Sequence, residues 1–246
     1  MIGIRLFDEK ETIKGYTLIE AFPGIGLVGT MSGSYMIEKL NMKYIGYISS
    51  DLFPPIAAVH DAVPMHPARI YKNEKYKLVL FIAEFAIAAN AVYQLTSEIL
   101  AFARKYGVLR MVSVGGMPAQ KPSDTIYMTS SDESTVKKAG KIGIKAIEEG
   151  VVAGVSASLL VNAKEFGIPA IDILVEVNPS IMDPKYAEIA ITGLNKLLGV
   201  EVDLSELEEE AKEVEAKISE MMSKVKESHE HYANADNVGS GPSMYA

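Results

Sequence analysis

The sequence has 246 residues, which is long enough for one large domain with a sizeable hydrophobic core. It contains no cysteine, so disulfides, thiolate catalysis and cysteine-ligated metal centres are excluded. The net charge of −8 argues against a nucleic-acid backbone or an acidic lipid surface as the main partner. The start of the chain shows no signal peptide, and the longest apolar segment, residues 78–95, contains Glu84, which is costly inside a membrane. We therefore expect a soluble, cytoplasmic protein.

Apolar runs rich in branched residues predict strands, and amphipathic segments that end at glycine predict helices. The expected strands are residues 1–7, 16–22, 44–50, 77–83, 109–114, 126–130 and 170–177. The expected helical segments are 26–40, 90–106, 132–140, 151–167 and 184–198, with a loop or small hairpin in 56–72 that leads into a further strand. This alternation predicts an α/β fold, a mostly parallel sheet covered by helices on both faces, with ligand sites at the edge where the strands end.

A glycine-rich turn follows the second expected strand. Gly24, Gly26 and Gly29 fit the pattern GxGxxG, which lets a pyrophosphate approach the backbone at a helix N-terminus. Asp51 lies roughly twenty residues further on, where dinucleotide sites place a ribose-binding acid. The same glycines also permit a tight turn and close packing of a helix on a sheet. Both interpretations stay open at this stage, and the packing turn is favoured.

Two glutamates follow expected core strands. Glu84 and Glu176 stand where a catalytic acid or base would lie, although structural hydrogen bonding to loop backbone is favoured because no nucleophile accompanies them. A second glycine-rich turn is expected at residues 115–118. His60 and His66 share a proline-containing loop, but their spacing matches no standard metal motif, so ordinary loop histidines are favoured.

The composition changes at Asp203. Apolar residues then recur three and four positions apart as a heptad seam, and Asp203 with Glu206 fits a helix-capping box. We expect a helix over 203–232, ending near His229 and His231, whose seam either packs on its own domain or mediates self-association. Residues 233–246 lose this periodicity and are expected to form a flexible tail. The expected division is therefore 1–202, 203–232 and 233–246.

Three segments together resemble the proteasome assembly chaperone family, specifically its archaeal homologues. They are FPGIGLVG at 22–29, DLFPP at 51–55 and VGGMP at 114–118, and the resemblance extends over about residues 15–198. It implies an α/β fold similar to nucleoside phosphorylases but without their catalysis, so the protein is expected to be no enzyme and to need no cofactor or metal. It also implies that GxGxxG is here a packing turn.

The last three residues, Met244-Tyr245-Ala246, match the hydrophobic-Tyr-any-residue terminus of proteasome activators. The resemblance implies that this tail enters pockets of the core-particle α-ring. Met244 would be the apolar anchor, Tyr245 would act on the gate, and Ala246 would carry the carboxylate that pairs with a pocket lysine. Activator-type relatives are homo-oligomers, and a tetramer is favoured here.

The sequence thus indicates two possible functions from different classes. The leading one is an ATP-independent proteasome-binding factor, acting as an activator that opens the gate, as an assembly chaperone, or as both. The alternative is a small-molecule enzyme of the phosphorylase-like or dinucleotide-binding type that uses the Gly24–Gly29 turn.

Overall fold

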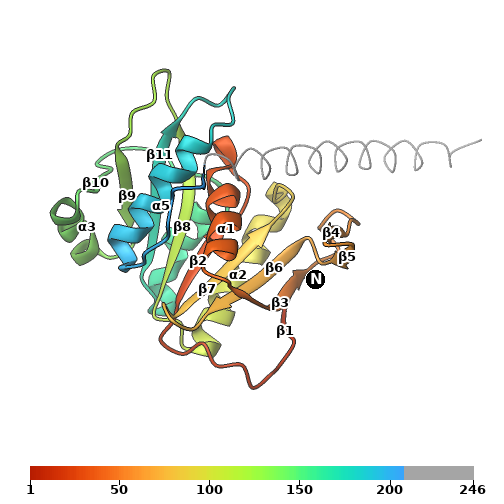
Figure 1. Cartoon of the computed structure of the whole chain (residues 1–246). Coiled ribbons are helices and arrows are strands. Elements are labelled where there is room, and N and C mark those ends of the chain that lie inside the picture. Colours follow the sequence, from red (N-terminus) through yellow and green to blue (C-terminus); the bar gives the residue numbers. More distant parts are fainter. Residues whose placement is uncertain (208–246) are drawn as a thin grey trace, which may run out of the picture.

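A computed structural model describes residues 1–207 of the chain. In this part, nine strands form one twisted sheet in the order β1-β3-β6-β7-β2-β8-β11-β9-β10, and β4 and β5 form a separate hairpin (Figure 1). The strands are β1 Gly3–Leu6, β2 Thr17–Ala21, β3 Lys43–Ser49, β4 Ala58–His60, β5 Val63–Met65, β6 Ala68–Asn73, β7 Leu78–Ala83, β8 Arg110–Pro118, β9 Ile126–Ser130, β10 Lys145–Ala146 and β11 Ala170–Val177.

The centre of the sheet is parallel. β2 pairs with β7 and with β8, and β8 pairs with β11, all in parallel. The flanks run antiparallel where β6 joins β7 and where β9 joins β11. Because the four central strands point the same way, their carboxyl ends meet at one edge of the sheet. The predicted α/β fold is confirmed, with its parallel strands gathered in the middle.

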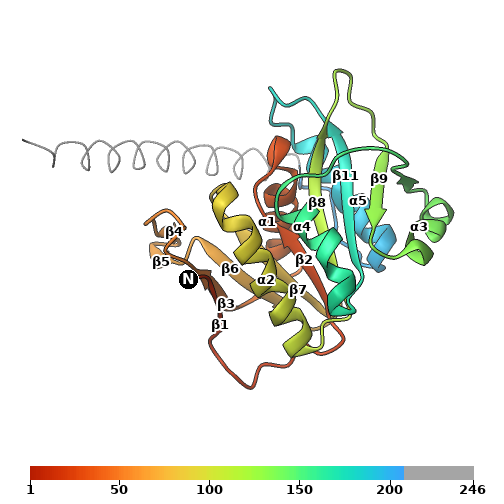
Figure 2. The same cartoon turned by 180° about the vertical axis from the view of Figure 1, so that it is seen from behind.

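Helices cover both faces of this sheet. α1 Val28–Lys39 and α5 Pro184–Leu198 lie together on one face. α2 Ala89–Tyr106 and α4 Gly154–Asn162 lie on the other face, which Figure 2 shows from the front. The short α3 Glu133–Ala139 lies beside β10, and single 3-10 turns occupy η1 Ile25–Leu27, η2 Gly140–Ile142 and η3 Ala163–Phe166.

The three-layer arrangement follows from central strands that are apolar on both faces, because each face must be covered by a layer of helices. All six residues of β7 are buried, as expected for a strand covered on both faces. One core cluster fills the space between the sheet and α1 with α5, and a second lies between the sheet and α2 with α4. Sequence signals set the helix ends: Asp183 caps α5 ahead of Pro184, and Gly107 ends α2 in the left-handed conformation.

Two predicted boundaries are wrong. Residues 115–118 form no turn, because β8 continues through Pro118 and pairs with β11 residue by residue, from Gly115 opposite Leu174 to Pro118 opposite Val177. The helix expected at 151–167 begins only at Gly154. Residues 147–153 instead run from β10 across the end of the sheet to α4 (Figure 2).

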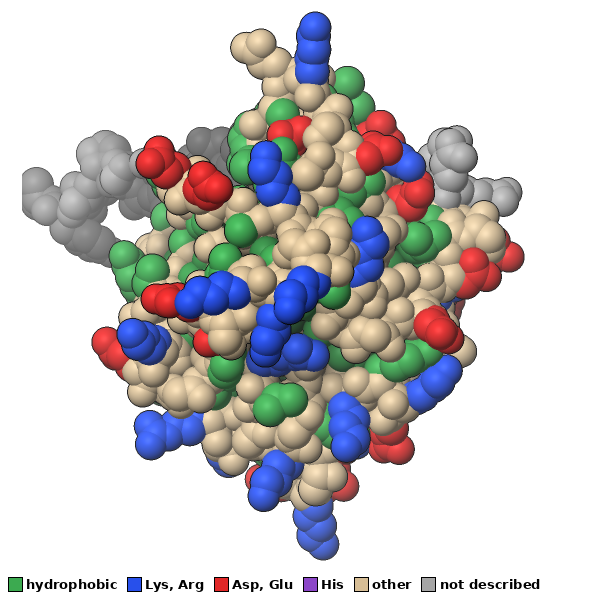
Figure 3. All heavy atoms as spheres, turned by 90° about the vertical axis from the view of Figure 1, so that its left-hand side faces the viewer, with side chains coloured by type: hydrophobic (Ala, Val, Ile, Leu, Met, Phe, Trp, Pro, Cys, Tyr) green, Lys and Arg blue, Asp and Glu red, His purple; other side chains and the backbone are tan. Residues whose placement is uncertain are grey.

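The β9–β10 edge of the sheet is locally basic. Figure 3 looks at this side of the molecule and shows Lys and Arg side chains gathered near its middle. The elements at this edge, α3, η2, β10 and the end of α5, carry exposed lysines at positions 137, 138, 141, 145 and 196. The net negative charge of the whole chain therefore does not describe this edge.

The last described residues pack on the domain. Tyr35 of α1 donates a hydrogen bond of 2.7 Å from its hydroxyl to the Asp203 carbonyl oxygen, and Leu207 is buried in the core cluster beside α1 and α5. Residues 208–246, which include most of the predicted helix and the whole predicted tail, lie outside the described residues. Among residues 1–207, no helix combines the length and apolar character that crossing a bilayer requires.

Candidate functional site

The glycines of the GxGxxG pattern are used for close contact between helix and strand. Gly26 has a φ of 67°, a left-handed conformation that favours glycine. A Cβ at Gly29 would lie 2.6 Å from the Val114 carbonyl oxygen and 2.9 Å from that of Phe22, so α1 can reach the sheet only with glycine there. The structure thus uses this turn for packing, as the favoured interpretation expects.

Asp51 is not part of this turn. Its exposed side chain forms an ion pair with the N-terminal amine, which lowers the pKa of the Asp51 carboxyl through a hydrogen bond and through charge. It does not line the pocket described below. The structure therefore does not place Asp51 as a ribose-binding acid.

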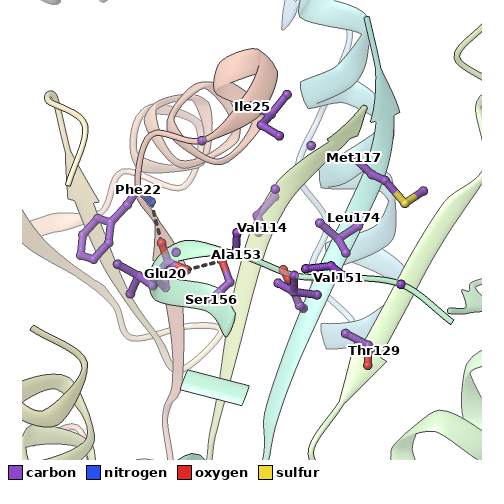
Figure 4. Close-up of a pocket in the computed structure, with 18 of the residues that line it drawn as sticks. Glu20, Phe22, Ile25, Val114, Met117, Thr129, Val151, Ala153, Ser156 and Leu174 are labelled. Carbon is purple, nitrogen blue, oxygen red and sulfur yellow. Dashed lines mark hydrogen bonds between the residues drawn. The ribbon is translucent and has the colours of Figure 1, made fainter. Parts of the chain in front are cut away.

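A pocket of about 460 Å³ opens beside the glycine turn, on the α2/α4 face of the sheet. Its floor is formed by β2, β8, β9 and β11 near the carboxyl ends of the parallel strands, and residues 147–156 cover it. Figure 4 shows Glu20, Ser156, Val151 and Leu174 around this space. A pocket of this size at this edge of a parallel sheet is typical of small-molecule sites.

A buried polar row crosses the sheet beneath the pocket. Strand pairing places Glu20 opposite Ser113, Ser113 opposite Asp172, and Asp172 opposite Thr129. Residues directly opposite each other on paired strands point to the same face. Two carboxyl groups and two hydroxyl groups from four adjacent strands therefore lie side by side on one face of the sheet.

The two carboxyl groups differ in their partners. Glu20 Oε1 accepts a hydrogen bond of 3.0 Å from the Phe22 amide, and Oε2 accepts one of 3.4 Å from the Ser156 hydroxyl (Figure 4). Burial raises the pKa of Glu20, and these bonds together with one from Ser113 offset part of that rise.

Asp172 is 0% exposed, and neither of its carboxylate oxygens has a hydrogen-bond partner among the described residues. Burial, and then the charge of Glu20, raise the pKa of Asp172 well above its ordinary value of 3.8. A buried carboxyl group without a partner is costly to the fold, so its presence indicates a use beyond packing.

The two glutamates predicted from the sequence have structural partners. Glu84 is buried in an ion pair with Arg69, and its Oε1 lies 2.7 Å from His60 Nε2. Glu176 accepts hydrogen bonds of 2.9 Å and 2.7 Å from the amide and hydroxyl of Ser123. Neither glutamate lines the pocket. Glu176 accepts a hydrogen bond from loop backbone, as the favoured interpretation expects, whereas Glu84 pairs with the side chains of Arg69 and His60 instead.

The loop histidines also have local partners. His60 contacts Glu84, as described above, and the ring of His66 stacks on Tyr47 with a centroid separation of 3.7 Å and an interplanar angle of 4°. No group of three or more His, Asp or Glu side chains suited to a metal ion occurs in residues 1–207. His229, His231 and the predicted partner-binding residues Met244, Tyr245 and Ala246 lie outside the described residues.

Sequence reasoning missed the carboxyl groups of the pocket. Glu20 interrupts the strand TLIEA, and Asp172 interrupts AIDILVEV, which also contains Glu176 near its end. That interruption was the available signal, since a charged residue in a doubly covered strand needs a reason to be there. Strand order and register, which the sequence did not supply, bring the two residues together.

Comparison with known proteins places the chain among archaeal relatives. An uncharacterized protein of Methanocaldococcus jannaschii is 30% identical over 224 residues, which cover 90% of this chain and 92% of that one. PbaA of Pyrococcus furiosus, described as an archaeal homolog of proteasome-assembly chaperone, is 25% identical with a TM-score of 0.82, covering 93% of this chain and 100% of its own.

The same fold occurs in PbaB of Pyrococcus furiosus, described as an archaeal proteasome activator, which is 21% identical with a TM-score of 0.75 over 89% of this chain and 98% of its own. These matches confirm the resemblance that the three sequence motifs indicated. The sequence profile of the PAC2 family matches residues 18–222, well over half of the sequence, and the chain therefore belongs to the PAC2 family.

Proposed function

We propose that this protein is a non-enzymatic, ATP-independent proteasome-binding factor of the cytoplasm, acting as an activator, an assembly chaperone, or both. The observation that carries the proposal is the similarity to PbaA across 93% of the chain, combined with a sequence that ends in Met244-Tyr245-Ala246. The fold alone does not select this function, because one fold supports many functions. The terminal tripeptide supplies the specific feature.

In the proposed mechanism, the terminal residues enter pockets of the core-particle α-ring. Met244 fills an apolar site, Tyr245 acts on the gate, and the carboxylate of Ala246 pairs with a lysine of the pocket. A single short tail buries little surface, so several tails on one homo-oligomer would bind by avidity at roughly millimolar effective concentration. Pairing of a carboxylate with a lysine also makes the interaction weaken as salt is added.

We propose a homo-oligomer, a tetramer, assembled in part through the C-terminal seam. Leu204 and Leu207, the first two seam residues, pack against the core of their own domain. Self-association would therefore use the later seam positions, beginning at Ala211. We propose 1–202 as the domain, 203–232 as a segment that begins packed on it and continues to the oligomer, and 233–246 as the proteasome-binding segment.

The alternative enzyme has weaker support from the site. A phosphorylase or a dinucleotide-binding enzyme must hold phosphate groups, for which proteins use basic side chains or free helix amides. The described residues that line the pocket include Glu20, Glu148 and Asp172 but no Lys, Arg or His. The glycine turn is itself packed against β8.

The test compares four chains and one control variant for binding to purified archaeal core proteasome and for hydrolysis of a fluorogenic peptide. They are the parent chain, a chain lacking residues 244–246, Tyr245→Ala, and a chain with one glycine appended after Ala246. The appended glycine keeps every side chain and moves only the terminal carboxylate. Conservative Met244→Leu serves as the matched control, because it keeps an apolar anchor.

The proposal expects the parent chain and Met244→Leu to bind and to accelerate hydrolysis, and the deletion and the appended glycine to do neither. Binding that survives the deletion would overturn tail docking. Assembly is assayed separately, as formation of α-rings from isolated α subunits with and without the protein. Acceleration of hydrolysis by finished core particles supports an activator, and faster ring formation supports an assembly chaperone.

A further inference from the structure

The pocket over the polar row carries an inference that does not depend on the proposed function. Asp172 lies in its floor, 0% exposed, with both carboxylate oxygens unpartnered among the described residues. Glu20, two strands away on the same face, is 3% exposed and interacts with Asp172 through charge. A bound group that donates hydrogen bonds would satisfy the oxygens that the protein leaves without partners.

The electrostatics of the pocket select the charge of that group. The ionisable side chains among its described lining residues are Glu20, Asp172 and Glu148, of which Glu148 is exposed at the rim. None of the three is basic, so the described lining offers no counter-charge to an anionic ligand, whereas a carboxyl group that gives up its proton attracts a cation. Two carboxyl groups are few for a metal ion, since Ca²⁺ takes six to eight oxygen ligands.

The remaining lining gives the shape of the ligand. The walls are apolar. Thr129 stands opposite Asp172 on the paired strand, and the Ser156 hydroxyl donates a hydrogen bond to Glu20. The apolar walls are formed mainly by Phe22, Ile25, Ile87, Val92, Val155 and Leu174. An ammonium group has three donors, which suit two carboxylates and a hydroxyl, and its hydrocarbon part would contact these walls.

We propose that the pocket binds a small organic amine, with its ammonium group between Asp172 and Glu20 and its apolar body against the walls. Because Asp172 is 0% exposed, neighbouring side chains must shift for the ammonium to reach its oxygens. Each carboxylate then accepts a hydrogen bond from the ammonium, and a hydroxyl of Thr129 or Ser156 accepts the third. The covering residues 147–156 shield this contact from water, which strengthens it.

The amine competes with protons for the same carboxyl groups. Burial raises the pKa of both Glu20 and Asp172, so the empty pocket holds protons that the bound cation displaces. The only other ionisable group among the described lining residues is exposed Glu148. Affinity for an amine therefore rises with pH until the amine itself loses its proton.

The experiment is calorimetric titration of the full chain with three ligands of one shape, benzylamine, benzyl alcohol and benzoate, and with tyramine and putrescine. We expect saturable binding of at least one amine with one site per chain, and far weaker binding of benzyl alcohol and benzoate. Asp172→Asn should weaken amine binding about ten- to a hundred-fold, the effect of one charge-assisted hydrogen bond. Exposed Glu165→Gln, outside the pocket, is the matched control and should change nothing.

A second variant tests the location without touching either carboxyl group. Gly24 lines the pocket, has an extended backbone, and offers nothing within 4 Å of an added Cβ. Gly24→Leu should therefore fold and block amine binding, whereas Gly24→Ala should retain it.

Three results would overturn the proposal: no amine binds at 10 mM, on the order of the weakest specific affinities; benzyl alcohol binds as tightly as benzylamine; or Asp172→Asn and Gly24→Leu both keep full amine affinity. Binding of Ca²⁺ or Mg²⁺ that Asp172→Asn abolishes, without amine binding, would replace it with a metal site.

Discussion

Replacing Glu84 with glutamine tests whether this carboxylate stabilises the fold or stands free for chemistry. Glu84 follows β7, and its side chain is 8% exposed beside Arg69, which is 4% exposed. The Glu84 carboxylate is the anion paired with that guanidinium, and its Oε1 also lies 2.7 Å from His60 Nε2. Glutamine keeps the size of the side chain but leaves the charge of Arg69 buried without a counter-charge.

Removal of one partner from a buried ion pair costs about 3–5 kcal/mol of unfolding free energy. For a chain of this size, that corresponds to a fall in Tm of roughly 2–4 °C per kcal/mol. Glu176→Gln is the matched control. Its hydrogen bonds from Ser123 and Tyr127 lie near the surface, and their weakening should cost about 1 kcal/mol or less.

The assay is urea unfolding of the full chain followed by circular dichroism. Burial acts to raise the pKa of Glu84, but the hydrogen bond with His60 and the charge of Arg69 outweigh it and lower that pKa below 4.5. The stabilisation is therefore present above pH 4.5 and is lost as the pH falls through the lowered pKa, so the parent and Glu84→Gln should converge in acid.

The double change Arg69→Met with Glu84→Met, which removes both charges of this pair, should recover most of the stability. A Glu84→Gln variant as stable at pH 7 as Glu176→Gln would refute the reasoning.

Three further changes test the packing and the pocket. Gly29→Ala should lose about 1–3 kcal/mol because its Cβ meets backbone on two sides, whereas Gly24→Ala should stay within about 0.5 kcal/mol; calorimetry of both decides. The parent should lose stability relative to Asp172→Asn as the pH rises above 3.8. The pKa of Asp172 is raised in the folded state, so above pH 3.8 the folded parent binds more protons than the unfolded parent does. Equal pH profiles of Tm for the two chains would contradict this. Leu207→Ala should cost about 2–5 kcal/mol if the start of the predicted helix is part of the domain core, and an unchanged urea midpoint would exclude that.

The sequence predicted most of the fold because strong local signals mark its elements. The helix at 184–198 was predicted with its observed bounds, since Asp183, Pro184 and Gly199 fix its two ends. The extension of β8 was not predictable in the same way. Gly115 and Gly116 favour a turn locally, but pairing along the whole of β11 keeps them in a strand.

The pocket was harder to predict because it depends on contacts between distant segments. Glu20 and Asp172 are 152 positions apart in the numbering, and only the order β2-β8-β11 with its register brings them to one face. Glu84 and Glu176 drew attention because they follow strands. They proved to have partners nearby, Arg69 for the first and Ser123 for the second. A glutamate that follows a strand is therefore a weaker sign of a ligand site than a charged residue that lies inside a strand and has no partner.

The glycine pattern shows why a motif can correctly predict a backbone conformation and still suggest the wrong ligand. Any strand–turn–helix unit in which the helix lies close to its strand needs glycine at the contact, and Gly29 meets that need here. Nucleotide binding needs more, namely exposed amides and surroundings that favour an anion. Those surroundings are reversed in this chain, because β2, which leads into the turn, contributes Glu20, and β11, two strands away, contributes Asp172. The glycines thus account for the turn, and the carboxyl groups on the strands decide the charge of what the adjoining pocket can hold.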